Sequence, residues 1–374
     1  MIKDIYSKSI LRKHKRIDSW FVSSYGMNLY RGCMHDCSYC DGRSEKYNVH
    51  GDFGKDVEVK VNAVEILEKE LNPEKKRHPL KRGYILLGGG VCDTYQTVEK
   101  KYLLSRKTLE LISKLNYPVH ILTKSTLVLK DIDLISKINH NSCAIISFSF
   151  SSCNNEMSRV FEPCVPLPSE RLETIKIIKE QGISCGFFLM PVIPYVTDTA
   201  EIMEESISRA KDAGVDFIIF GGMTLKDGKQ KNHFLNVLSR FNPSLIKKYD
   251  EIYYPSVWGN ASSEYNKSIS NIFFSIVKKY HIPIRIPLNL FSDILSENDK
   301  ITVMLDHLQY INQINSEESF FGLAANSISQ LKKPVSEIKD ELTALKGIGN
   351  FTNKIILEII ETGTCKYFEN KMKT

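Results

Sequence analysis

Three closely spaced cysteines are the residues best suited to do chemistry in this 374-residue chain. Cys33, Cys37 and Cys40 form a C-x3-C-x2-C pattern, with Tyr39 just before the last cysteine. Thiolates are soft ligands that select iron–sulfur clusters, zinc or Cu(I). A cubane cluster usually takes four cysteines, so three leave one iron with an open position. The spacing favours a cluster over a structural zinc site, because zinc sites usually show paired C-x2-C or C-x2-C…H-x3-H spacing.

The cysteine loop resembles the cluster motif of the radical S-adenosylmethionine (SAM) superfamily, C-x3-C-x-aromatic-C. The resemblance implies that Cys33, Cys37 and Cys40 hold a [4Fe-4S] cluster and that Tyr39 lies beside the cofactor. It also implies that SAM binds the open iron through its amino and carboxylate groups. One electron then splits SAM into methionine and a 5′-deoxyadenosyl radical. An electron donor such as flavodoxin or ferredoxin is therefore an expected partner.

Alternating strand and helix patterns position this loop. Short apolar runs predict strands at 24–30, 84–87, 119–122, 144–150, 183–190 and 215–220, with helical spacing between most of them. About six strand–helix units predict an α/β fold with a parallel sheet and helices outside it. The resemblance implies a partial (β/α)6 TIM-like barrel. Functional groups in such barrels lie at the carboxyl ends of the strands, where the cysteine loop also begins.

Several candidate SAM-binding residues lie at or near predicted strand ends: Gly88, Gly89, Gly90, Lys124, Ser147 and Ser149. By resemblance, the glycine turn accepts the SAM amino group through backbone oxygens. The compact ammonium of Lys124 suits the SAM carboxylate. Ser147 and Ser149 share one face of a strand, so they are candidates to hold the ribose or the carboxylate. An equal alternative is that both hydroxyls bond to the neighbouring backbone.

Cys92 follows the triple glycine and should lie at the same rim as the cysteine loop. A carbon radical easily abstracts a thiol hydrogen, so Cys92 is a candidate to return a hydrogen atom to a product radical. The alternative is that Cys92 is a small apolar filler.

The chain from Tyr30 to about Asp198 resembles the spore photoproduct lyase-related branch of the superfamily, often described as DNA repair photolyase-like. The matching stretches are 28–33, 93–100, 122–125, 161–163 with Arg171, and 191–194 with 197–198. The resemblance implies a lyase-like repair of DNA with catalytic roles for Cys92 and Tyr39. Asp41 departs from the branch, which has a second relay tyrosine directly after the third cysteine.

The last part of the chain is helical by pattern. We expect a basic N-terminal extension at 1–22, the barrel at 23–300 and a small helical domain at 301–374. The stretch 342–356 resembles a helix-hairpin-helix motif. Gly347 and Gly349 permit a tight turn beside Lys346, and the following helix start favours an anion such as a nucleic-acid phosphate. The alternative is a helical hairpin that binds nothing.

Composition restricts where the protein is expected to act but does not identify its substrate. The net charge of +6 permits a nucleic-acid partner. The chain has no apolar run long enough for a transmembrane helix and no apolar signal core, so we expect a cytoplasmic protein without a membrane partner. The favoured function is a radical SAM enzyme that acts on nucleic acid, with DNA preferred. The alternatives are modification of RNA or a peptide, or a non-catalytic, metal-stabilised nucleic-acid-binding module.

Overall fold

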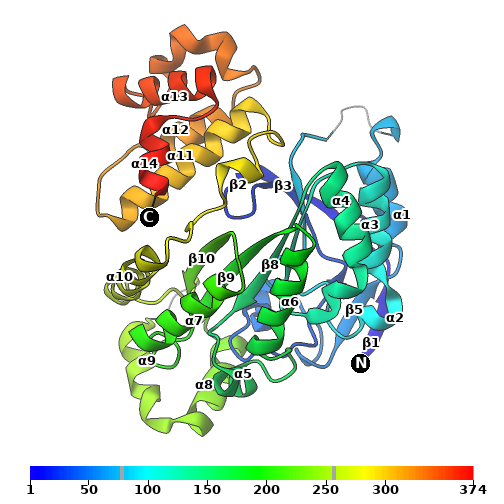
Figure 1. The fold of residues 1–374 in the computed structure, drawn as a ribbon. Helices are drawn as coiled ribbons and strands as arrows, with labels where there is room; N and C mark the ends of the chain where they lie inside the picture. The colour runs from blue at the N-terminus through cyan, green and yellow to red at the C-terminus, as the bar shows by residue number, and fades with distance from the viewer. Residues whose placement is uncertain (76–79, 255–257, 374) are drawn as a thin grey trace.

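Seven strands form one curled sheet in the computed structural model, which describes residues 1–75, 80–254 and 258–373 (Figure 1). The strand order is β10-β9-β8-β7-β6-β3-β2. The bounds are β2 (Leu11–Asp18), β3 (Ser23–Met27), β6 (Tyr84–Leu87), β7 (Val119–Thr123), β8 (Ala144–Phe150), β9 (Ser184–Val192) and β10 (Phe217–Gly222). The strands from β3 to β10 run parallel, and β2 is antiparallel to β3. The predicted α/β class with a partial TIM-like barrel is confirmed.

Helices connect the parallel strands on the outer face of the sheet (Figure 1). They are α1 (Ala63–Leu71), α3 (Leu104–Lys114), α4 (Ile132–Asn141), α6 (Pro168–Glu180) and α7 (Ala200–Asp212), and α10 (Ser263–Tyr280) follows the last strand. Local sequence sets their ends. The Thr199 side chain accepts the N–H of Ile202 at the start of α7, and Gly214 follows its end with a φ of +79°. Every helix among the described residues is too short or too polar to cross a membrane.

Further helices lie in the loops after the strands: α2 (Glu99–Tyr102) after β6, α5 (Asn155–Phe161) after β8, and α8 (Lys229–Phe241) and α9 (Ile246–Ile252) after β10. These loops therefore gather around the carboxyl ends of the strands.

The N-terminal residues expected as a basic extension instead form two strands. β1 (Ile2–Ile5) joins β5 (Val57–Lys60) and β4 (Tyr30–Arg31) in a small sheet of order β1-β5-β4. β2 forms an edge of the large sheet, and Arg16 on β2 pairs with Asp306 at 2.7 Å. An edge strand can carry charged side chains toward solvent, so its basic run looks like a solvated end in the sequence alone.

The C-terminal helices pack against the amino ends of the strands (Figure 1). They are α11 (Glu297–Ile314), α12 (Phe321–Ser329), α13 (Asn350–Thr362) and α14 (Lys366–Met372), with a 3-10 segment at Val335–Ala344. One apolar cluster joins buried residues of these helices to Tyr84 of β6, Ile145 of β8 and Phe217 of β10. These strand residues are the first or second of their strands, so the helices cover the end of the barrel opposite the strand carboxyl ends.

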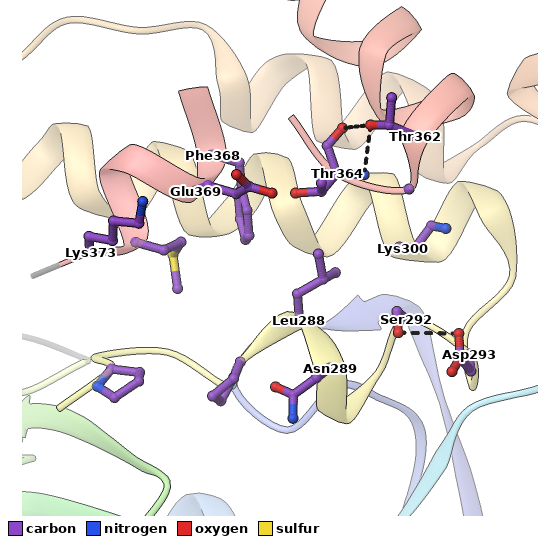
Figure 2. Close-up of a pocket in the computed structure, with 14 residues that line it drawn as sticks. Leu288, Asn289, Ser292, Asp293, Lys300, Thr362, Thr364, Phe368, Glu369 and Lys373 are labelled. Carbon is purple, nitrogen blue, oxygen red and sulfur yellow. Dashed lines mark hydrogen bonds between the residues drawn. The ribbon is translucent and has the colours of Figure 1, made fainter. Parts of the chain in front are cut away.

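A cavity of about 680 Å³ lies between the helices and the segment that enters them (Figure 2). Leu288, Phe368 and Met372 supply apolar walls, and Lys300, Glu369 and other polar residues lie around them. Its described lining residues include none of the candidates predicted from sequence.

Candidate functional site

The three predicted cluster cysteines come together in a small cavity at the strand carboxyl ends. This cavity, about 70 Å³ in volume, is lined by Cys33, His35, Cys37, Cys40, Gly90, Val91, Cys92, Asp93, Leu122, Thr123, Lys124 and Ser149. The residues come from the loop after β4, the loop after β6, and the ends of β7 and β8. The cavity thus brings together most candidates that the sequence placed on separate strands.

The cysteine loop is fixed by hydrogen bonds to distant segments. Ser38 N–H donates to the Phe161 carbonyl at 2.8 Å, and Gln230 Nε2 donates to the Tyr39 carbonyl at 2.9 Å. Arg43 Nε donates to the Cys37 carbonyl at 3.0 Å. These bonds hold the backbone around the second and third cysteines.

Asp41, the residue that departs from the branch pattern, forms a polar link to the last strand. Its carboxylate accepts the Thr224 hydroxyl at 2.6 Å and pairs with the Lys226 ammonium at 2.7 Å. The Lys226 side chain is almost fully buried. Asp41 therefore ties the end of the cysteine loop to the residues that follow β10.

The thiols fit a cluster that supplies positive charge. Burial raises the pKa of all three, and it raises the pKa of Cys40 to about 11. The thiolate is the metal ligand, so the charge of a metal must offset the cost of deprotonation here. Within the described ranges, no three His, Cys, Asp or Glu side chains are arranged to hold one metal ion. Each cysteine of a cubane holds a different iron, so these three thiols can serve a cluster without meeting at one ion.

Glu162 is a buried charge centre that the sequence did not assign a role. Its carboxylate accepts the Tyr39 hydroxyl, Lys124 Nζ at 3.0 Å and Arg171 Nη2 at 2.5 Å. Burial alone would raise the pKa of Glu162, but the Arg171 guanidinium and the Lys124 ammonium outweigh it and hold the pKa well below its usual range. Two cations against one carboxylate give this buried group a net positive charge, and Lys124 is its member that lines the cavity.

Lys124 lies where the sequence placed it, with its ammonium on the cavity wall. Nζ donates to the Ser149 hydroxyl at 3.0 Å and to the Ser149 carbonyl at 3.2 Å, in addition to Glu162. An ammonium has three N–H donors, so these three acceptors match its capacity. A SAM carboxylate at Lys124 would therefore share or replace one of these acceptors.

The two candidate serines separate in the structure. Ser149 lines the cavity, and its hydroxyl donates to the Met190 carbonyl at 2.9 Å. Ser147 lies deeper in the barrel, fully buried, with its hydroxyl 2.7 Å from His120 Nε2. A Cβ on Gly186 would lie 2.4 Å from the Ser147 hydroxyl, so glycine leaves room for this contact. The structure thus places Ser149 at the site and Ser147 beneath it.

The glycine turn needs glycine at two positions. Gly88 and Gly90 have φ of +92° and +59°, and a Cβ on Gly88 would lie 2.6 Å from the Leu122 carbonyl oxygen. Gly89 N–H donates to Asn28 Oδ1 at 3.1 Å. Gly90 lines the cavity, so Gly88 and Gly89 shape the turn while Gly90 faces the site.

Cys92 shares the cavity with the cluster cysteines. Its Sγ lies 3.3 Å from the Gly32 carbonyl and 3.5 Å from Gln96 Nε2. Burial raises the pKa of Cys92 to about 12, so the thiol keeps its hydrogen.

Asp93 is a second functional candidate that sequence reasoning missed. Its carboxylate pairs with His35 Nε2 at 3.0 Å. It also accepts the Thr123 hydroxyl at 2.8 Å and the backbone N–H of Lys124 at 2.6 Å. It joins the cysteine loop to the end of β7. The sequence feature that could have indicated Asp93 is its position in the stretch 93–100, which resembles the branch.

A larger cavity of about 340 Å³ extends the site. It shares Cys37, Cys40, Gly90, Lys124 and Ser149 with the small cavity. Its other walls include Tyr47, Phe188, Met190, Pro191, Met223 and Thr224. Except for Pro191, which lies in the branch-like stretch 191–194, sequence reasoning did not single out these mostly apolar residues, because they look like ordinary core.

The predicted hairpin lies at the other end of the molecule. Gly347 has a φ of +86°, and a Cβ there would lie 2.7 Å from the Ala324 nitrogen, so the turn packs tightly on α12. Gly349 and Lys346 are exposed, and α13 begins at Asn350. Ile348 belongs to the apolar cluster at the strand amino ends, so the structure does not bring the hairpin to the cysteine cavity.

Comparisons with known proteins define the class. The family model described as the radical SAM superfamily matches residues 27–208, and the chain belongs to this superfamily. It is a radical SAM enzyme, and the superfamily uses a [4Fe-4S] cluster and SAM.

Particular relatives extend the comparison. An uncharacterized protein of Mycobacterium tuberculosis is 31% identical over 233 residues, covering 61% of this chain and 67% of that protein. An uncharacterized protein of Methanocaldococcus jannaschii is 29% identical over 214 residues, covering 57% of this chain and 75% of that protein. A structure of spore photoproduct lyase complexed with dinucleoside spore photoproduct shares the fold. Its TM-score is 0.55 and its identity 15%, with 75% of this chain and 79% of that chain covered.

Proposed function

We propose that this radical SAM enzyme acts on nucleic acid, with a lyase-like repair of damaged DNA as its reaction. The observation that carries the proposal is the cavity that Cys33, Cys37, Cys40, Cys92 and Lys124 line together. A cluster site and a hydrogen-donor thiol in one cavity suit a reaction that begins and ends with hydrogen transfer.

We assign the cofactor roles as follows. Cys33, Cys37 and Cys40 hold the [4Fe-4S] cluster, which supplies the electron that splits SAM when both are bound. Lys124 and Ser149 hold the SAM carboxylate, since the Lys124 ammonium on the cavity wall favours an anion and lies beside the Ser149 hydroxyl. Gly90 presents its backbone to the SAM amino group. Tyr39 packs its ring under Lys124, whose Nζ lies 5.6 Å from the ring centre.

Cys92 returns the hydrogen atom in this proposal. The product radical takes the hydrogen from Sγ, forming a C–H bond and leaving a thiyl radical. One electron from the donor protein and one proton restore the thiol. The buried, protonated state of Cys92 supports this role.

Three observations support a nucleic-acid substrate. The chain carries a net charge of +6. The hairpin at Gly347 and Gly349 exposes a helix start beside Lys346, which suits a backbone phosphate. The fold is shared with a lyase whose structure is described as complexed with a dinucleoside photoproduct.

Anaerobic reconstitution tests the chemistry. We expect four irons and four sulfides per chain by the cubane composition, an EPR signal of the reduced cluster that changes when SAM is added, and release of 5′-deoxyadenosine. One zinc without sulfide would instead support the non-catalytic binding module.

Substrate assays test the finer assignment. Irradiated DNA, RNA and peptide substrates are compared for product formation and for 5′-deoxyadenosine release. We expect turnover with DNA, and turnover with RNA or a peptide instead would overturn the choice of substrate. Cys92→Ala should still release 5′-deoxyadenosine but give by-products; clean repaired product from this variant would remove the hydrogen-donor role.

A further inference from the structure

Three described residues after α9, Tyr253, Gly259 and Asn260, are anchored to the strand end that forms the larger cavity. Tyr253 is buried, and its hydroxyl donates to the carbonyl of Met223, a residue of the cavity wall. Asn260 forms a bridge with Thr224, another wall residue. Leu225 N–H donates to the Gly259 carbonyl at 2.7 Å. Tyr253 and, directly after Trp258, Gly259 and Asn260 are thus tied to the residues that line the cavity.

Gly259 allows its backbone to approach the backbone of Leu225 and Lys226 closely. Its φ is +64°, and a Cβ there would lie 2.4 to 2.5 Å from backbone atoms of Leu225 and Lys226. Because glycine alone fits this approach, the position of Trp258 is set by the backbone that precedes α8.

Trp258 presents an aromatic surface at this mouth. Its exposed fraction is 67%, whereas tryptophan is usually buried over most of its surface. Lys46 Nζ lies 4.4 Å from the centre of its ring, and the next residue, Tyr47, lines the larger cavity. The ring therefore lies between solvent and the loop that carries the cysteines. Tyr254, which is 64% exposed, adds a second aromatic side chain nearby in sequence.

Basic groups accompany the aromatic surface. Lys46 contacts the ring of Trp258, and Lys229 is exposed at the start of α8. Glu45, the residue before Lys46, accepts the Lys229 backbone N–H at 3.1 Å. An aromatic face with a lysine against it suits a single strand, since a base stacks on the ring and the ammonium attracts the phosphate.

We propose that Trp258 is a stacking platform for an unpaired nucleobase at the mouth of the cavity. This inference rests on the proposed function and narrows its substrate to a strand whose reacting base has left the duplex stack. Both DNA and RNA carry such bases, so the shared chemistry is the unpaired base and the experiment separates the two sources.

Intrinsic fluorescence can test the platform directly, because the chain has two tryptophans. Trp20 packs near Arg285 at the amino end of the barrel, with the guanidinium 5.1 Å from its ring centre. In the reconstituted Trp20→Phe protein, Trp258 supplies the tryptophan signal. We expect short oligodeoxyuridylate and oligouridylate, which share the base and differ only in the sugar, to quench it saturably, and the stronger response identifies the preferred sugar. A blunt duplex with paired bases should quench less.

A matched variant supplies the control for fluorescence. The Trp258→Phe protein keeps Trp20 and should show no quenching. Equal quenching of both proteins, equal quenching by inorganic polyphosphate, or no quenching of the Trp20→Phe protein would each overturn the platform.

Binding of a labelled oligothymidylate gives an independent readout. Trp258→Ala should weaken it about tenfold, within the range for one base stacked on an aromatic side chain, and Trp258→Phe should restore most of the affinity. Phe320→Ala removes an aromatic side chain that is 72% exposed on the C-terminal helices and should leave binding unchanged. Equal losses in Trp258→Ala and Phe320→Ala would contradict the proposal.

Failure of this inference is separable from failure of the proposed chemistry. Reductive cleavage of SAM by the Trp20→Phe protein tests the chemistry without any nucleic acid. Cleavage without quenching removes the platform alone, whereas a protein that does not cleave SAM removes the proposed function.

Discussion

The two ends of the barrel bury different kinds of side chains. At the carboxyl end, Glu162, Lys124 and Arg171 form a buried charged network beside the cysteine loop. At the amino end, Phe217, Phe291 and Leu305 are fully buried in an apolar cluster with the C-terminal helices. Buried charges are costly unless they are paired, whereas buried apolar surface stabilises a fold. The comparison indicates that the carboxyl end is arranged for chemistry and the amino end supplies stability.

The strongest test of this contrast uses one residue type at both ends. Cys37→Ala at the cavity should abolish release of 5′-deoxyadenosine, because the cluster loses a ligand. Cys143→Ala, at an exposed position before β8, is the control and should leave release unchanged. Product analysis after anaerobic reconstitution measures both. Equal activity of Cys37→Ala and Cys143→Ala would break the assignment of the carboxyl end.

The second test concerns the amino end. Leu305→Ala removes a fully buried side chain on α11 and should lower the free energy of unfolding by about 2–5 kcal/mol. Denaturant titration measures this, with the exposed Phe320→Ala as control. At a temperature where Leu305→Ala stays folded, SAM cleavage should match the parent. A selective loss of cleavage would show that the two ends are coupled.

The third test probes the positive wall of the cavity. Lys124→Met should raise the KM for SAM about 10–100-fold, because a hydrogen bond to a charged group contributes about 1.5–3 kcal/mol. Lys130→Met, at an exposed position nearby in sequence, is the control. Kinetics of 5′-deoxyadenosine release give KM and kcat for each protein. An unchanged KM in Lys124→Met would place the SAM carboxylate elsewhere.

The smallest expected effect is a pH dependence from the interior of the barrel. Burial lowers the pKa of His120 to about 4, from a usual value near 6.5. The unfolded chain then binds the proton more readily, so this contribution to stability is complete above pH 6.5 and is lost as the pH falls toward 4. Between pH 7.5 and 5.5, the parent should lose about 1 kcal/mol more than His120→Gln.

Denaturant titrations at the two pH values measure this difference, with His140→Gln on the exposed surface of α4 as the matched control. Equal losses in the parent and His120→Gln would show that another group carries the acid sensitivity.

Because the hairpin packs at the amino end of the barrel, its proposed contact with phosphate is best tested by a point substitution. Deletion beyond Ser316 would remove α12 to α14 and expose the apolar cluster that they share with α11. Such a deletion would confuse loss of DNA binding with loss of folding. Substituting the exposed Lys346 tests the proposed phosphate contact without removing packed helices.

The sequence alone determined the parts of this protein that depend on local spacing. Three cysteines within eight residues converge in one cavity because a short loop cannot separate them. Apolar runs between helical segments indicated the parallel sheet, and strand ends indicated Gly90, Lys124 and Ser149. The sheet is confirmed, and Gly90, Lys124 and Ser149 line the cavity, because neighbouring residues and strand order constrain each other directly. The roles of these three residues in binding SAM stay predictions.

Tertiary structure alone decided the contacts between residues far apart in the chain. Lys124 meets Glu162 across 38 residues, and Asp41 meets Thr224 across 183. Ser147 and Ser149 share a strand face, yet depth in the barrel gives one to His120 and the other to the cavity. The hairpin lies at the amino end because apolar burial placed the C-terminal helices there. No local pattern records such pairings, since they follow from how whole elements pack.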